Sequence, residues 1–113
     1  MSKFAYISKY LEMRLSEYEI EVIVSCAKDN FGKNTSVILF GSRVVDIKKG
    51  GDIDLLVKPG IKASMEEMIQ KKLIMLMELD QKLGAQKIDL LLQQPGDKRT
   101  IIKTAEENGI TIC

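Results

Sequence analysis

The spacing of apolar residues along the chain predicts alternating helices and strands. Ser16 and Glu19 have the Ser-x-x-Glu pattern of a helix capping box, so a helix is expected to begin there. Its apolar side chains recur at helical spacing until Gly32 ends the run. The resulting stripe should cover one face of a sheet. Its members are Ile20, Ile23, Val24, Ala27 and Phe31.

Three short apolar runs rich in β-forming residues predict strands over 35–40, 52–57 and 87–92. The first run ends abruptly in Gly41-Ser42, after which a helical start is expected. The predicted order is helix, strand, helical turn, strand, long helix, strand, helix. This order is typical of an α/β (α+β) domain in which helices pack on a small mixed sheet.

The long helix is predicted between an N-cap at Ser64 and a stop at Gly84. Ile74, Met75 and Met77 make its apolar stripe wider than one core needs. Two interpretations remain: a broad core helix, which the pattern favours, and a Met-rich surface that adapts to a partner. The remaining apolar positions are Met65, Met68, Ile69, Leu73, Leu76, Leu79 and Leu83.

Asp97 is expected to cap a short final helix that buries Ile101, Ile102 and Ala105, with a short extended stretch after it. At the other end, residues 1–12 form a separate extension. It is interpreted as an extra helix, a partner-docking arm or the product of an upstream start codon. The rest of the chain, 13–113, is expected to be one domain.

Paired carboxylates indicate a metal site. Residues i and i+2 of a strand point to one face, so Asp52 and Asp54 would project side by side. Adjacent carboxylates repel unless a cation such as Mg²⁺ or Mn²⁺ lies between them. Asp89 joins the pair if its strand lies beside theirs. Because Asp54 and Asp89 each lie between apolar residues, burial would be costly without a metal. The alternatives are that Asp52 caps a turn and that surface strands simply carry acids.

The Gly41-Ser42 turn is a candidate phosphate site. A strand that runs into small residues and then a helical start exposes backbone N–H groups and a hydroxyl to phosphate oxygens. Arg43 is close enough in sequence to contact the phosphate. No Gly-Lys-Ser/Thr follows, so this is not a Walker loop, and an ordinary turn is the alternative interpretation.

Composition narrows the function classes. With 113 residues the chain has room for a single modest core. A net charge of +1 gives no sign of nucleic-acid binding, and no apolar run is long enough for a membrane span or a signal peptide. A cytoplasmic protein is therefore expected. The absence of histidine excludes Ser-His and Cys-His nucleophiles and histidine-bound zinc.

The ordered set Gly41-Ser42, Asp52-Ile53-Asp54 and Asp89 resembles the DNA polymerase beta-type nucleotidyltransferase superfamily, and within it the minimal nucleotidyltransferases of prokaryotes. The resemblance covers the chain from about Met13 to its end. It implies that the three aspartates bind two Mg²⁺ ions and carry the catalysis. It also implies that Gly41, Ser42 and Arg43 hold the nucleoside triphosphate, with ATP as the expected substrate and a hydroxyl as the acceptor.

The same resemblance implies a partner. Small members of this family are similar to the antitoxins of toxin-antitoxin pairs, in which the nucleotidyltransferase adds AMP to a helical HEPN-type protein. Two alternatives stay open. The chain could act as a binding-only antitoxin that masks its partner, or it could modify a small molecule such as an aminoglycoside, which would require a second domain or a dimer. The oligomeric state is not determined by the sequence.

Overall fold

The computed structural model of the chain describes residues 15–40, 53–84 and 87–113. Its strands form one sheet in the order β3-β2-β1-β4. β1 runs antiparallel to β2 and β4, whereas β2 and β3 are parallel, so the sheet is mixed as predicted. The strands are β1 (Ser36–Phe40), β2 (Ile53–Lys58), β3 (Ile88–Leu92) and β4 (Ile110–Thr111).

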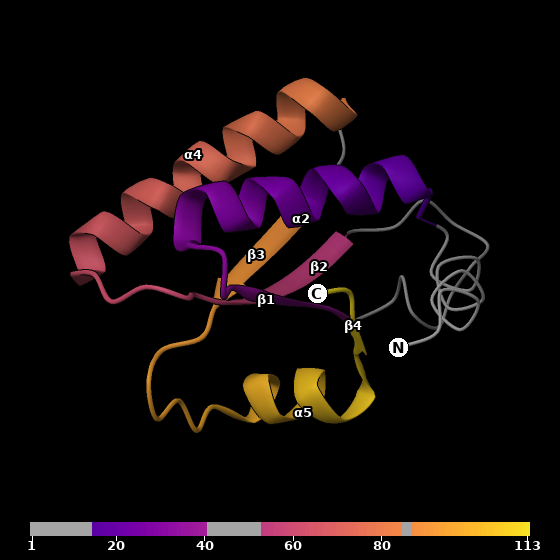
Figure 1. The fold of residues 1–113 in the computed structure, drawn as a ribbon. Helices are drawn as coiled ribbons and strands as arrows, with labels where there is room; N and C mark the ends of the chain where they lie inside the picture. Colours follow the sequence, from indigo (N-terminus) through magenta and orange to yellow (C-terminus); the bar gives the residue numbers. More distant parts are fainter. Residues whose placement is uncertain (1–14, 41–52, 85–86) are drawn as a thin grey trace.

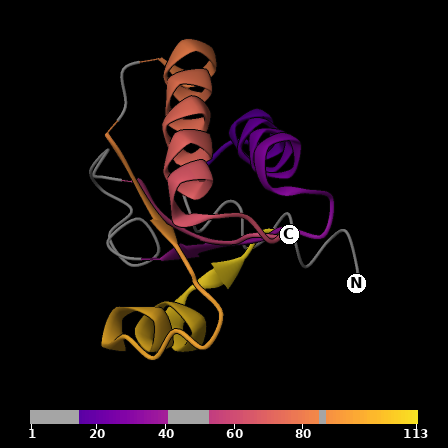
Figure 2. The same ribbon diagram turned by 90° about the vertical axis from the view of Figure 1, so that its left-hand side faces the viewer.

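Helices cover both faces of this sheet (Figures 1 and 2). The helices are α2 (Glu17–Phe31), α4 (Met65–Leu83) and α5 (Thr100–Asn108). α2 and α4 lie side by side over one face, and α5 lies against the other. In the described ranges, no helix has the length and apolar character needed to cross a membrane.

The predicted start and end of α2 are confirmed. The Ser16 hydroxyl accepts a hydrogen bond from the Glu19 N–H, and the Glu19 carboxylate accepts one from the Ser16 N–H, each at 3.0 Å. Gly32 ends the helix with a φ of 102°, a value that side chains disfavour. The helix buries its apolar stripe as expected, with Val24 packed at the margin of the core.

Strand alternation divides the apolar residues between two cores. Ile53, Leu55 and Val57 of β2 belong to the larger core, beneath α2 and α4. Leu56 packs instead with Ile102 of α5 in a smaller core on the opposite face. Because successive side chains of a strand point to opposite faces, β1, β2 and β3 each contribute to both layers.

The long helix α4 departs from the favoured interpretation. Its predicted ends are confirmed, since the Ser64 hydroxyl accepts from the Glu67 N–H and Gly84 follows the last turn. Met75 and Leu79 are fully buried, but Leu73 is 55% exposed and Met77 is 63% exposed. The broad-core interpretation is therefore wrong. α4 packs on α2 and β3, so only part of its apolar surface is covered by neighbouring elements.

The final helix α5 also begins differently from the prediction. Arg99, not Asp97, occupies the N-cap position, and no side chain caps the helix there. The Asp97 carboxylate instead accepts hydrogen bonds from the Arg99 guanidinium and backbone N–H. Ile102 and Ala105 are buried as predicted, whereas Ile101 is 48% exposed. A helix of nine residues offers the sheet only a narrow stripe.

Two predictions about secondary structure fall outside the described residues. These are the extension over 1–12 and the helical start after Gly41-Ser42. The short extended stretch at the end of the chain is confirmed as β4, and the pairing continues beyond it because the Val37 N–H donates to the Cys113 carbonyl oxygen.

Replacing Gly109 with alanine should cost about 2 kcal/mol of unfolding free energy or more. A Cβ there would lie 2.4 Å from the Ala105 carbonyl oxygen and 2.8 Å from that of Leu39, and neither backbone atom can move away cheaply. Gly96→Ala is the matched control. Its φ of 71° adds about 1 kcal/mol of strain but no described atom crowds the new methyl group. Urea unfolding measures both, and equal losses would contradict the crowding argument.

Asp97 should make stability depend on pH. The Arg99 guanidinium holds the pKa of the Asp97 carboxyl well below its usual range. A lowered folded-state pKa stabilises the protein above the unfolded pKa of about 3.9, and this stability is lost as the pH falls toward the folded value. Asp97→Asn should therefore unfold more easily than the wild type at pH 7, with a gap that narrows below pH 4. Denaturant unfolding at several pH values tests this, with Asp29→Asn as the control; a gap independent of pH would refute it.

Candidate functional site

The parallel pairing of β2 with β3 brings two of the predicted site residues together. Asp54 and Asp89 are register partners across this pair. Neighbouring strands lie about 4.8 Å apart, and directly paired residues point to the same face. The two carboxylates therefore project side by side from the amino-terminal ends of their strands.

A residue of a third strand, β1, lies in one row with these two aspartates across the sheet. Phe40, the last residue of β1, is the register partner of Asp54 on the other side of β2. Phe40, Asp54 and Asp89 share the face of the sheet that α5 covers, because Ile53 and Leu55 point into the opposite core. β1 thus ends in this row at Phe40, and Gly41 is the next residue in the sequence.

The row lines a cavity of about 510 Å³. Ile101 from α5 and Lys72 and Leu76 from α4 complete its wall. Asp54 is half-buried and Asp89 is exposed. The expectation that both carboxylates are buried is therefore wrong for Asp89, because its side chain is exposed at the open cavity whereas Ile88 and Leu90 pack in the larger core.

Sequence reasoning did not identify Phe40, Lys72 or the cavity role of Ile101. These residues come from three elements far apart in the chain and meet only in the folded sheet. Lys72 is the notable omission, because it brings a cation to a cavity that holds two carboxylates. No local motif marks it, since lysines are common on the polar face of helices.

Four predicted site residues, Gly41, Ser42, Arg43 and Asp52, lie outside the described residues. Their roles stay predictions. Among the residues that are described, no group of three or more His, Cys, Asp or Glu side chains is close enough to hold a metal ion. The described part of the proposed metal site is thus the pair Asp54 and Asp89.

Comparison with known sequences decides the family. A sequence model described as the nucleotidyltransferase domain matches residues 20–112. The chain belongs to the nucleotidyltransferase domain family. The match includes most of α2, Asp54, Asp89 and every described strand of the sheet, and it supports the polymerase beta-type superfamily that the motifs resemble. A search of curated proteins found no match to this nucleotidyltransferase.

The donor set of this nucleotidyltransferase suits a hard divalent cation. Mg²⁺ and Mn²⁺ prefer carboxylate oxygens and retain open positions for water and phosphate. Asp54 and Asp89 supply such oxygens from adjacent strands, beside a cavity that leaves room for a substrate. The residues present therefore fit the metal that the family motif implies.

Asp89→Asn should leave the fold intact in the absence of divalent cations. The change removes one of two neighbouring like charges, so the unfolding free energy should stay within about 0.5 kcal/mol of the wild type or rise slightly. Thermal unfolding in EDTA measures this, with the exposed Glu107→Gln as a charge-matched control. A clear loss of stability would mean that Asp89 has a structural role instead.

Proposed function

We propose that this chain transfers AMP from ATP to a hydroxyl group in a Mg²⁺-dependent reaction in the cytoplasm. One observation carries the proposal: Asp54 and Asp89 are paired in register at the end of the sheet where β1 leads into Gly41-Ser42. The nucleotidyltransferase family supplies the reaction class. The nucleotide, the metal and the acceptor are our proposals.

Each candidate residue has a stated role in this reaction. Asp52, Asp54 and Asp89 would hold two Mg²⁺ ions, which neutralise the triphosphate and lower the pKa of the acceptor hydroxyl. Ser42, Arg43 and the backbone N–H groups around Gly41 would hold the β- and γ-phosphates. The acceptor oxygen forms a bond to the α-phosphorus as the bond to the bridging oxygen breaks. Pyrophosphate leaves, and Asp89 helps to remove the hydroxyl proton.

A protein is the proposed acceptor. We call the 510 Å³ cavity beside Asp54 and Asp89 the catalytic cavity. In the described residues it is open and has few groups that would bind a small acceptor. The exposed apolar side of α4 is suited to a protein surface instead. By family resemblance, the partner would be a helical HEPN-type protein and this chain its antitoxin. The same exposed side of α4 is compatible with a binding-only antitoxin, and consumption of ATP distinguishes the two.

Incubation with Mg²⁺ and α-labelled ATP should label a HEPN-type partner encoded beside this chain. Asp54→Asn and Asp89→Asn should each reduce labelling at least about 100-fold, because each removes a metal ligand while preserving volume. Asp80→Asn, on the exposed surface of α4, is the matched control and should retain activity.

Thermal unfolding should show that all three variants are folded. Full labelling by Asp54→Asn would refute the metal assignment. A tight complex with the partner but no label in any condition would favour the binding-only antitoxin.

A further inference from the structure

A second hollow adjoins the catalytic cavity and continues along β3 to the other end of the sheet. We call it the β3 groove; its volume is about 700 Å³, within the range of ligand sites. Lys72 and Leu91 line both hollows, so the two are adjacent. Apolar side chains form much of the groove, among them Ile61, Met65, Met68, Ile69 and Leu92.

The charged groups of the β3 groove are all basic among the described residues. They are Lys58, Lys62, Lys72 and Arg99. Lys58 pairs with Glu106 at 2.6 Å, and Arg99 pairs with Asp97, which is 5% exposed. Lys62 and Lys72 have no carboxylate within ion-pair distance in the described part of the chain. An acidic ligand would therefore be attracted to these lysines, and most of all to Lys62, because Lys72 also lines the cavity that holds Asp54 and Asp89.

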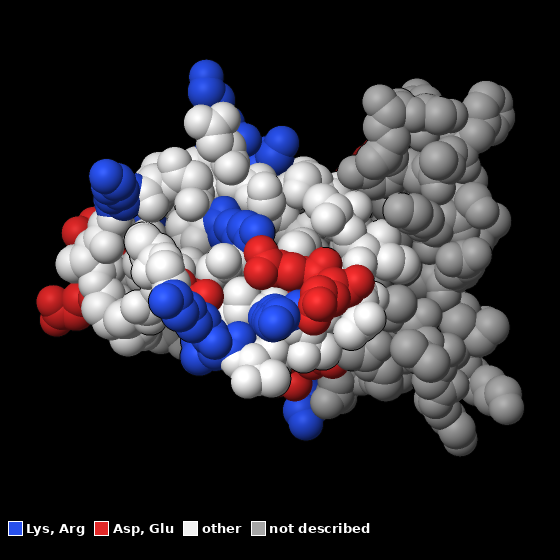
Figure 3. Space-filling view, turned by 90° about the horizontal axis from the view of Figure 1, so that it is seen from below, with Lys and Arg blue, Asp and Glu red and all other residues white. Residues whose placement is uncertain are grey.

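The surface around this groove is not uniformly basic. In the view from below, the largest acidic group lies near the middle, with basic side chains above it, below it and to its left (Figure 3). Such interleaving does not suit a nucleic-acid backbone, which needs a continuous basic stripe. A local pair of free lysines is better matched to a few acidic side chains of a polypeptide.

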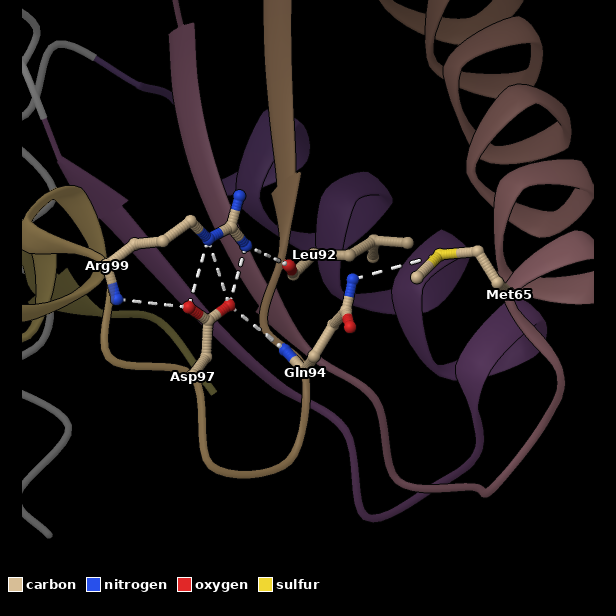
Figure 4. A network of polar contacts seen from close by, with 5 residues as sticks. All are labelled: Met65, Leu92, Gln94, Asp97 and Arg99. Carbon is tan, nitrogen blue, oxygen red and sulfur yellow. Dashed lines mark hydrogen bonds and ion pairs between the residues drawn. The ribbon is translucent and has the colours of Figure 1, made fainter.

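Polar contacts hold the mouth of the β3 groove in shape (Figure 4). The Arg99 guanidinium donates to the Leu92 carbonyl oxygen at 3.0 Å, and the Gln94 amide donates to the Met65 sulfur at 3.7 Å. The loop after β3 is thereby tied to the first turn of α4. Beside it, the side-chain oxygen of Gln93 is buried and has no hydrogen-bond partner among the residues that the structure describes. A buried acceptor of this kind is costly to leave without a hydrogen bond.

The backbone of β3 can hold an extended peptide. The Lys87 carbonyl oxygen and the Gln93 N–H bond to β2, so alternate residues of β3 use their backbone groups on that side. Ile88 and Leu90 therefore present theirs to the opposite side, where the described sheet has no further strand. Addition of a strand to such an edge is a common mode of peptide recognition.

An apolar row on α4 extends this surface. Met65, Ile69, Leu73 and Met77 recur every four residues, and each is at least half exposed. We call this row the α4 ridge. Met65 and Ile69 also line the β3 groove, so the ridge and the groove form one continuous surface.

We propose that the β3 groove and the α4 ridge bind an extended acidic segment of the protein that accepts the nucleotide. This inference rests on the proposed function, because the segment must present its hydroxyl to Asp54 and Asp89. The free lysines select acidic side chains, the ridge takes apolar ones, and the edge of β3 holds the backbone.

The geometry also specifies a spacing. Asp89 and Gln93 are four residues apart along β3, which corresponds to about 13 Å in an extended strand. A bound peptide is extended too, so it covers this length in about four residues. Lys62 lines the groove together with Gln93, so the acidic side chains that pair with Lys62 should lie about four residues from the modified hydroxyl.

Peptide binding without nucleotide tests the groove separately from catalysis. The probes are two eight-residue peptides, each with one tyrosine and two adjacent glutamates. In one peptide the glutamates follow the tyrosine by four and five residues, and in the other they precede it by the same spacing. Matched peptides carry lysines in place of the glutamates. Fluorescence anisotropy measures affinity, and amide chemical shifts of the full chain locate the site. At least one glutamate peptide should bind about tenfold more tightly than its lysine counterpart and shift Gln93 and Leu90.

Charge reversal in the groove supplies the matched comparison. Lys62→Glu should weaken binding of the glutamate peptide about three- to tenfold, whereas Lys82→Glu, which lies outside the groove, should not. Equal binding of both peptides, equal effects of both variants, or shifts confined to another face would overturn the proposal. If the peptide binds as expected but is not labelled with ATP, the groove assignment stands and the proposed reaction fails.

Discussion

The parallel pairing of β2 with β3 is the constraint on which the candidate site depends. It places Asp54 beside Asp89 and sets the line along which the catalytic cavity and the β3 groove adjoin. Parallel neighbours cannot be joined by a tight turn, so the chain must cross over between them. α4 lies in this crossover, and its buried residues Met75 and Leu79 hold it on the sheet. Packing of one helix therefore supports the geometry of the two carboxylates.

Local sequence signals predicted most elements correctly because their causes are local. The capping box at Ser16 and the cap at Ser64 are short-range hydrogen bonds that the folded chain retains. The pairing of Asp54 with Asp89 could also be predicted, since each aspartate opens an apolar run of similar length. Exposure of α4 could not be predicted, because an apolar stripe does not reveal how much surface is available to cover it. Asp97 was misjudged for a similar reason: Arg99, two residues away, competes for its carboxylate.

Charge is distributed along β3 in a way that would separate metal and phosphate binding from peptide binding. Carboxylates lie at the amino-terminal end of the strand and Lys62 lies in the β3 groove near the other end, with Lys72 at the junction of the two hollows. Asp89 and Gln93 are about 13 Å apart along the strand, more than a Debye length in physiological salt, so charges at the two ends act on different parts of a bound molecule. The sheet thus provides one strand along which metal-bound phosphate and an acidic polypeptide would be kept apart.

The position of α4 between β2 and β3 in the chain also has a kinetic consequence. Residues 59–87 separate the two strands, so their pairing is a contact between distant parts of the chain. Such contacts pay the entropy of closing a long loop before they gain stability, and they form slowly compared with a helix. The two carboxylates would then become neighbours only late in folding, after α4 has docked. A partly folded chain would lack the site altogether, so nucleotide chemistry would be restricted to molecules that have completed their core.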